Sequence, residues 1–331
     1  MTELFATLIL AIHLAAMNLA SAGPLCFLWL RWDNRLADDS QNQVGRLRLQ
    51  MFRWSVAAYL LGMVLGVLLW LVLPGDGLAQ ALARFPSRAF GFAAAELLFS
   101  LVCMLPLALD WRFLQGRSWL SKLLAVMSAT NLLYHFPPLM AIVGQLASNP
   151  HWAKEPVLDR SVLLNLMAQW HVLALSCHFV LASVTVAAMA TLWLASQANS
   201  AAEMNAKMQK SIRHAGLVAL LTTLLQIPVG VWLLASTPAA TRTALMGGSL
   251  VTSLIFVVAM TGTLILLQRL ASIVLGDFGE STLRGACWLV LVIIFLMAAT
   301  LRWSRPDKSK SIKAKSPAAV SVVVDSAAGR F

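Results

Sequence analysis

Charged side chains are scarce in this chain, and acidic side chains are the scarcest of them. Asp, Glu, Lys and Arg make up 12% of the 331 residues, whereas 59% of the residues are hydrophobic and the mean hydropathy is +0.76. A soluble globular domain carries about twice that share of charge. The composition therefore excludes an ordinary soluble protein and predicts a polytopic membrane protein.

Cysteine is also scarce, and its spacing excludes two kinds of site. The sequence contains no CxxC and no CxxCH, and its four cysteines fall in four separate apolar stretches (Cys26, Cys103, Cys177 and Cys287). Cysteines placed in this way are typical of small buried hydrophobic residues. The missing CxxCH excludes a covalently attached c-type haem.

Long apolar runs make up most of the sequence. A bilayer core of about 30 Å needs roughly 20 apolar residues per helix. On this measure residues 1–302 form an all-α transmembrane domain of about eight helices. The run at 161–196 is long for one crossing, so we expect part of it to tilt or to project beyond the lipid. The predicted spans are 4–31, 51–73, 88–109, 118–146, 161–196, 213–235, 243–268 and 283–301.

The net charge of +11 is concentrated in a way that argues against nucleic-acid binding. Seven basic residues lie between Arg302 and Arg330, against only Asp307 and Asp325. We expect the tail at 303–331 to be disordered and to dock an acidic partner or anionic lipid. The other basic residues lie in short loops between spans, as expected of charges that set topology.

Loop charges also predict an orientation. The first, third and fifth loops are richer in Lys and Arg than the second, fourth and sixth loops. The positive-inside rule therefore places the N-terminus outside and the odd loops in the cytoplasm of a cell (inner) membrane. Eight spans would place the basic tail outside as well. Either the last span does not cross fully, or the tail is a partner-binding arm on the outside.

Four histidines lie inside predicted spans. Ionisable residues in lipid are costly and are usually functional, and neutral imidazole is a common axial ligand of haem iron. Counting along the spans places His13, His135 and His171 in one layer with Glu96, roughly 15 Å below the outer face. His178 follows His171 on the same helix face, about 10 Å further inward.

Each of these residues also has a simpler interpretation. A single intramembrane histidine is often a hydrogen-bonded packing residue, and the methionines in the spans are usually packing residues rather than haem ligands. Glu96 is a packing acid paired with a histidine, a proton relay or an iron ligand. Asn131 lies one turn before His135 and is placed to orient its imidazole. We expect His151 to be solvated and His214 to face lipid headgroups.

The pattern resembles subunit I of the cytochrome bd quinol oxidases. The resemblance covers roughly residues 4–235. It rests on His13 in LAIHLAAMNLASAGPL, Glu96 in AAAELLFS and His171 in AQWHVLALSCHF, together with ATNLLYHFPPLMAIVGQLASNP and LLQIPVGVWLLAS. It implies one or two b haems near the outer face, bound mainly by residues 4–235, with His13 and His171 as iron ligands and His135 or His178 completing the set.

The chain also departs from that family. The GRQPW motif is absent, the outer loop after the sixth span is reduced to STPAATRTALMGG, and the third span has only Glu96 as an acid. The methionine ligand of the family has no clear counterpart, and Met260 in FVVAMTGTLI is a weak candidate. These departures favour binding of b haem over oxygen reduction.

The sequence thus predicts a membrane cytochrome b that transfers electrons between a quinol pool and a periplasmic redox partner such as a cytochrome c, as one subunit of a respiratory complex. Two alternatives stay open. One is a cofactor-free transporter or assembly factor in which Glu96 and the histidines form a proton or metal path. The other is a divergent oxygen-reducing oxidase subunit.

Overall fold

The computed structural model describes residues 2–30, 43–72, 77–114, 117–198 and 206–304. These residues form helices and their connections, and they contain no strand. Eight helices are long and apolar enough to cross a bilayer. The predicted all-α polytopic membrane bundle is therefore confirmed. The eight long helices are α1 (Thr2–Ala22, continued by the 3-10 helix η1, Gly23–Leu28), α2 (Gln43–Val72), α4 (Ser87–Ala108), α5 (Ser118–Ser148), α7 (Trp170–Ala198), α8 (Ala206–Ser236), α10 (Leu250–Leu275) and α11 (Glu280–Trp303).

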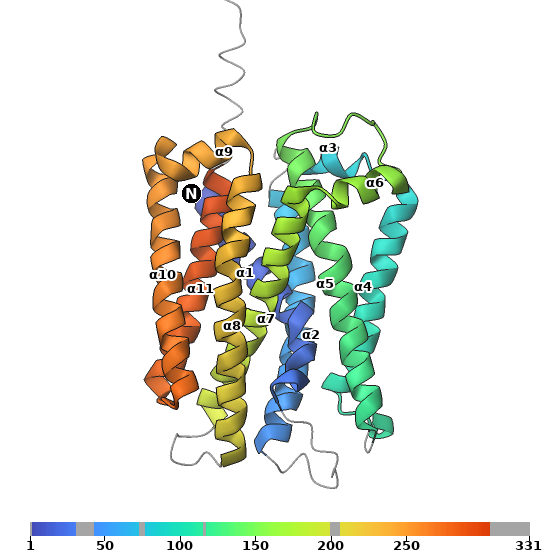
Figure 1. Ribbon diagram of the computed structural model, residues 1–331. Coiled ribbons are helices and arrows are strands. Elements are labelled where there is room, and N and C mark those ends of the chain that lie inside the picture. The colour runs from blue at the N-terminus through green and yellow to red at the C-terminus, as the bar shows by residue number, and fades with distance from the viewer. Residues whose placement is uncertain (1, 31–42, 73–76, 115–116, 199–205, 305–331) are drawn as a thin grey trace, which may run out of the picture.

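Short helices gather at one end of the bundle, which we call the α6 end. This end carries α3 (Leu78–Leu82), α6 (Arg160–Met167) and α9 (Ala239–Thr243), as Figure 1 shows. The helical turn η4 (Ala244–Gly248) connects α9 to α10. The 3-10 turn η2 (Arg112–Leu114) connects α4 to α5 and lies at the opposite end.

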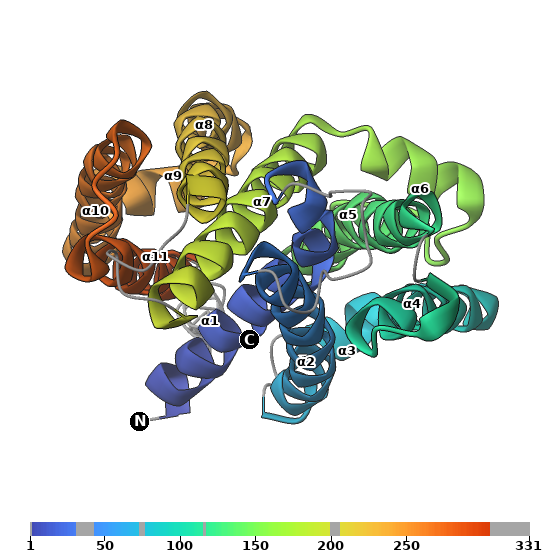
Figure 2. The ribbon, with the colours of Figure 1, turned by 90° about the horizontal axis from the view of Figure 1, so that it is seen from below.

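Helices α1 and α7 form the centre of the bundle. Seen along the helix axes, α8, α10 and α11 lie on one side of this pair, and α2, α4 and α5 lie on the other (Figure 2). Alanines with no exposed surface, among them Ala20, Ala187 and Ala188, line the contacts of α1 and α7. Small residues let helix backbones approach closely, which is the main source of packing energy between helices in lipid.

Both ends of the bundle domain lie at the α6 end. Arg302, near the end of α11, forms an ion pair of 2.5 Å with Glu3 at the start of α1. The last span therefore returns to the side on which the first begins. The tail itself, from residue 305 onward, lies outside the described residues.

The predicted single span at 161–196 is wrong in one respect, because the helix is interrupted at residues 168 and 169. Asp159 caps α6 by accepting a hydrogen bond of 2.8 Å from the Val162 backbone N–H. Helix α6 ends at Met167, and α7 begins at Trp170. Figure 1 shows α6 lying across the end of the bundle while α7 runs through it. The part expected to project beyond the crossing is thus a separate helix.

Candidate functional site

His13 on α1 is held against the backbone of α2. Its Nδ1 atom lies 2.9 Å from the carbonyl oxygen of Gly62. A carbonyl accepts only, so Nδ1–H donates and the Nε2 lone pair stays free. One turn further along α2, a Cβ atom on Gly66 would lie 3.2 Å from Cε1 of the imidazole. The two glycines thus let α2 approach closely enough to fix both the tautomer and the position of the ring.

The packing of α1 against α7 sets the depth of His178. The two segments run parallel, as two hydrogen bonds between them show. Ser183 donates to Asn18 at 2.7 Å, and further along both segments Trp29 donates to Thr191 at 2.9 Å. His13 lies five residues before Asn18, and His178 lies five residues before Ser183. His13 and His178 therefore lie at about the same level of the bundle.

His171 does not lie in this layer, which corrects the expected depth. It is the second residue of α7, about two turns closer to the α6 end than His178. Its neighbour Trp170 contacts Trp232, four residues before the end of α8, at a ring distance of 5.6 Å. The depth was miscounted because residues 161–167 belong to α6 and not to the spanning helix.

The two α7 histidines share one unusual property. The Nδ1 atoms of His171 and His178 are both buried, and neither has a hydrogen-bond partner among the described residues. Most buried polar atoms are paired, so an unpaired ring nitrogen marks a group whose hydrogen bonding is incomplete in the protein alone. Both rings thus carry a buried nitrogen that the described residues leave unpaired.

His135 and Glu96 form a pair between α5 and α4. The His135 Nδ1 atom lies 3.3 Å from Glu96 Oε1 and 3.0 Å from Asn131 Oδ1. The amide nitrogen of Asn131 donates to the Glu96 carbonyl oxygen at 2.7 Å and to Ser100 Oγ at 2.8 Å. The contact of Asn131 with His135 was predicted from the sequence. Pairing with a histidine was one of the three roles that the sequence left open for Glu96.

The Glu96–His135 pair lies close in depth to His13. Tyr59 on α2 donates a hydrogen bond of 2.9 Å to the carbonyl oxygen of Leu97, next to Glu96. Gly62, which holds His13, follows Tyr59 by three residues on the same helix. The separation along α2 is therefore about one turn, or roughly 5 Å. The layer contains His13, His178, His135 and Glu96, with His178 in the place expected for His171.

The remaining predicted residues lie elsewhere. Met260 is on α10, which packs against α8 and α11 at the edge of the bundle away from α4 (Figure 2). His151 is exposed in the loop before α6, and His214 is half-buried near the start of α8. The structure does not group these residues with the histidine layer.

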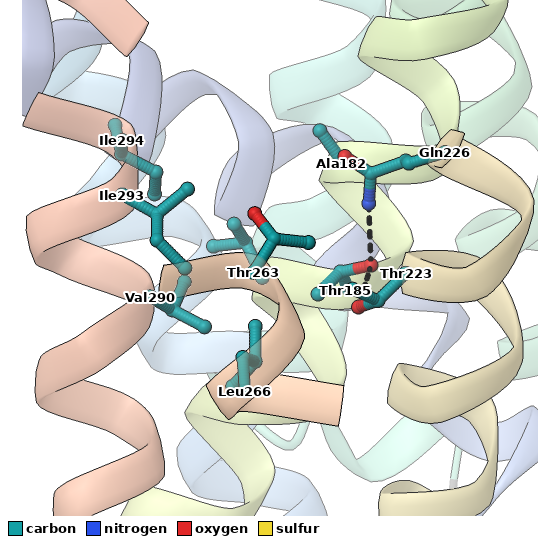
Figure 3. Close-up of a pocket in the computed structure, with 10 residues that line it drawn as sticks. Ala182, Thr185, Thr223, Gln226, Thr263, Leu266, Val290, Ile293 and Ile294 are labelled. Atoms are coloured by element: carbon teal, nitrogen blue, oxygen red, sulfur yellow. Dashed lines mark hydrogen bonds between the residues drawn. The ribbon is translucent and has the colours of Figure 1, made fainter. Parts of the chain in front are cut away.

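A small cavity with a cluster of hydroxyl and amide groups, between α7, α8, α10 and α11, was not predicted from the sequence. Thr185 accepts a hydrogen bond of 3.1 Å from Gln226 (Figure 3). Thr185 also lies 2.8 Å from Thr222. The cavity has a volume of about 60 Å³, and Thr223 and Thr263 also line it. Six of the ten residues that line the cavity are apolar, so its polar part is confined to the threonines and Gln226. Gln226 interrupts an apolar run, and this was the only sequence signal for the cavity.

The histidine layer offers single imidazoles from separate helices. Among the described residues, no group of three or more His, Cys, Asp or Glu side chains is placed to hold a metal ion. A haem needs only one or two protein ligands, because the porphyrin supplies the other four. Imidazoles that are oriented or unpaired on separate helices suit that requirement.

No known family model, curated protein or solved structure matches this chain.

Proposed function

We propose that this protein is an integral membrane cytochrome b that transfers electrons between a quinol pool and a redox partner outside the cell membrane. The proposal extends the resemblance of residues 4–235 to subunit I of the bd quinol oxidases. The observation that carries it is the state of His13, whose Nδ1–H is engaged by the Gly62 carbonyl at 2.9 Å so that Nε2 is free to act as an iron ligand.

Helix α7 supplies the partner of His13 in this proposal. His178 lies at the level of His13 and has an unpaired, buried Nδ1 atom, and His171 has the same property nearer the α6 end. Two b haems would use both residues, whereas one haem at the level of His13 would use His178. His135 has its Nδ1 engaged in the same way as His13, by Asn131 and Glu96, so it stays an alternative ligand in this proposal.

A bound haem would supply one-electron transfer. The residues of the chain would orient the ligand and exclude water. The Gly62 carbonyl raises the basicity of the His13 imidazole, and the close packing at Gly66 prevents the ring from turning away. The apolar side chains of α1, α2 and α7 exclude water, which disfavours the charged state of the site and so sets its potential.

The proposed topology puts the α6 end outside, because the opposite end carries the greater basic charge. Arg112, Arg117, Lys207, Lys210 and Arg213 lie at the ends of α4, α5 and α8 away from the α6 end. With this orientation the histidine layer is roughly 15 Å below the outer face, within reach of a periplasmic donor or acceptor. The basic tail would emerge on the same side and would dock an acidic partner, another subunit or anionic lipid.

A reduced-minus-oxidised absorption spectrum of the purified protein tests the proposal. We expect a b-type α band and its loss in His13→Ala, with full retention in the matched controls His151→Ala and His214→Ala. A protein purified from haem-replete cells that shows no α band would overturn the proposal. In that case a metal- or proton-coupled transporter, tested by flux into proteoliposomes, would become the leading alternative.

A further inference from the structure

The Glu96–His135 pair faces outward from the bundle. The side chains of Glu96 and His135 are 33% and 38% exposed, although both residues lie well inside membrane-spanning helices. Helix α4 lies at the edge of the bundle and packs against α5 and α2 (Figure 2). The exposed parts of the pair are therefore open to the lipid at the depth of the histidine layer.

The pair is incompletely satisfied. His135 Nδ1 is engaged by Asn131 and by one carboxylate oxygen of Glu96. The second carboxylate oxygen and His135 Nε2 make no hydrogen bond to any described residue, and neither atom is enclosed by protein. In hydrocarbon an unpaired acceptor of this kind is costly. A ligand hydroxyl, which has one hydrogen to donate, would satisfy one of these acceptors.

Aromatic side chains flank the pair. Phe92 and Phe99 are four residues before and three residues after Glu96, so they share its face of α4. They are 69% and 40% exposed, and the ring of Tyr134 lies 5.1 Å from the ring of His135. Exposed aromatic rings beside a polar pair suit a flat, apolar ring that carries hydroxyl groups.

We propose that Glu96 and His135 bind the head group of a bilayer-dissolved quinol, with one hydroxyl donating to the free oxygen of Glu96 and the ring lying against Phe92 and Tyr134. The identity of the ligand as a quinol rests on the proposed function, whereas the presence of a binding site rests on exposure and unsatisfied polar atoms. The site lies roughly 14 Å from the start of α4 and opens to the lipid, so a ligand dissolved in the bilayer reaches it directly. A small head group with a hydroxyl donor suits the free oxygen of Glu96 better than a protein helix does, because a helix would have to present a polar side chain at this one point of an otherwise apolar face.

The test uses the full-length protein in lipid nanodiscs with decylubiquinone and its photoreactive azido derivative as probes. We expect saturable binding of decylubiquinone, and we expect the azido label to map by mass spectrometry to residues 92–99 and 131–135. Glu96→Leu and Phe92→Ala should each weaken binding by roughly tenfold or more, as expected for loss of a charged hydrogen bond or of a stacking ring. Phe92 is exposed, so its substitution leaves folding intact even where Glu96→Leu does not. The matched controls are Glu280→Leu and His151→Ala.

The outcomes separate this inference from the proposed function. Unchanged binding in both variants, a label that maps elsewhere, or a second protein chain cross-linked at residues 96 and 135 would overturn the quinol site. The haem spectrum of the same samples reports the proposed function independently. A retained α band with no binding at the pair refutes only the quinol site, whereas binding without any α band refutes only the cytochrome.

Discussion

Ser183 on α7 donates a hydrogen bond of 2.7 Å to Asn18 on α1, deep inside the bundle. This contact fixes the register of two parallel helices and sets His178 beside His13 in depth. It also sets His171 about 10 Å away, toward the α6 end. The pairing between α1 and α7 therefore decides which histidines can act together.

The first prediction distinguishes the two α7 histidines. We expect His178→Ala to lose most of the b-type α band of a haem at the level of His13, and His171→Ala to lose clearly less. The reason is that only His178 shares the level of His13. Added imidazole should restore the band in His178→Ala, because it refills the vacated ligand position. Full retention in His178→Ala together with loss in His171→Ala would place ligation at the α6 end.

The second prediction concerns the backbone that holds His13. A Cβ on Gly66 would lie 3.2 Å from the imidazole, so Gly66→Val should displace the ring and weaken haem binding by roughly tenfold, equivalent to about 1.4 kcal/mol. Gly91→Val on α4 is the matched control, since nothing lies within 4 Å of a Cβ built there. Haem titration of the two apoproteins provides the measurement. Equal affinities would show that Gly66 has no role in positioning His13.

A third prediction addresses the contact between Thr185 and Gln226 in the small cavity. Thr185→Val leaves the Gln226 amide without its partner, so we expect the free energy of unfolding to fall by about 1 kcal/mol. The double variant Thr185→Val/Gln226→Leu should lose less than the sum of the single variants, because both partners are then apolar. Unfolding in mixed detergent and SDS micelles measures these changes. Thr263→Val is the control, because its hydroxyl bonds to the Ala259 carbonyl of its own helix. Additive losses would show that Thr185 and Gln226 are not coupled.

The fourth prediction is a pH dependence at the α6 end. Hydrogen bonds from the Val162 N–H and the Ser161 hydroxyl lower the pKa of Asp159 from its ordinary value of 3.8. Because the folded pKa is the lower one, the carboxylate stabilises α6 fully above pH 3.8, and this contribution is lost as the pH falls through the folded pKa.

Amide hydrogen exchange in residues 160–167 reports this effect. We expect exchange, corrected for its intrinsic rate, to accelerate below pH 3.8 in the wild type. Asp159→Asn should keep the cap but lose the pH dependence, since asparagine caps helices without ionising. Acceleration of the same size in Asp159→Asn would assign the pH dependence to another group.

The sequence predicted those parts of the site that depend on a single helix. The Asn131–His135 contact follows from a spacing of one turn, and the eight spans follow from hydropathy alone. The depth of His171 was wrong because the boundary between α6 and α7 depends on the cap at Asp159, which an apolar run conceals. The role of Gly62 and Gly66 could not be predicted, because it depends on the register between α1 and α2. The contact between Thr185 and Gln226 could not be predicted either, because it depends on the register between α7 and α8.

The central claim is that His13 is an iron ligand, and the spectrum of the purified full-length protein tests it most directly. A dithionite-reduced minus oxidised spectrum should show a b-type α band, and His13→Ala should abolish the band of the haem bound at its level. A spectrum without an α band, or an unchanged band and haem content in His13→Ala, would contradict the claim.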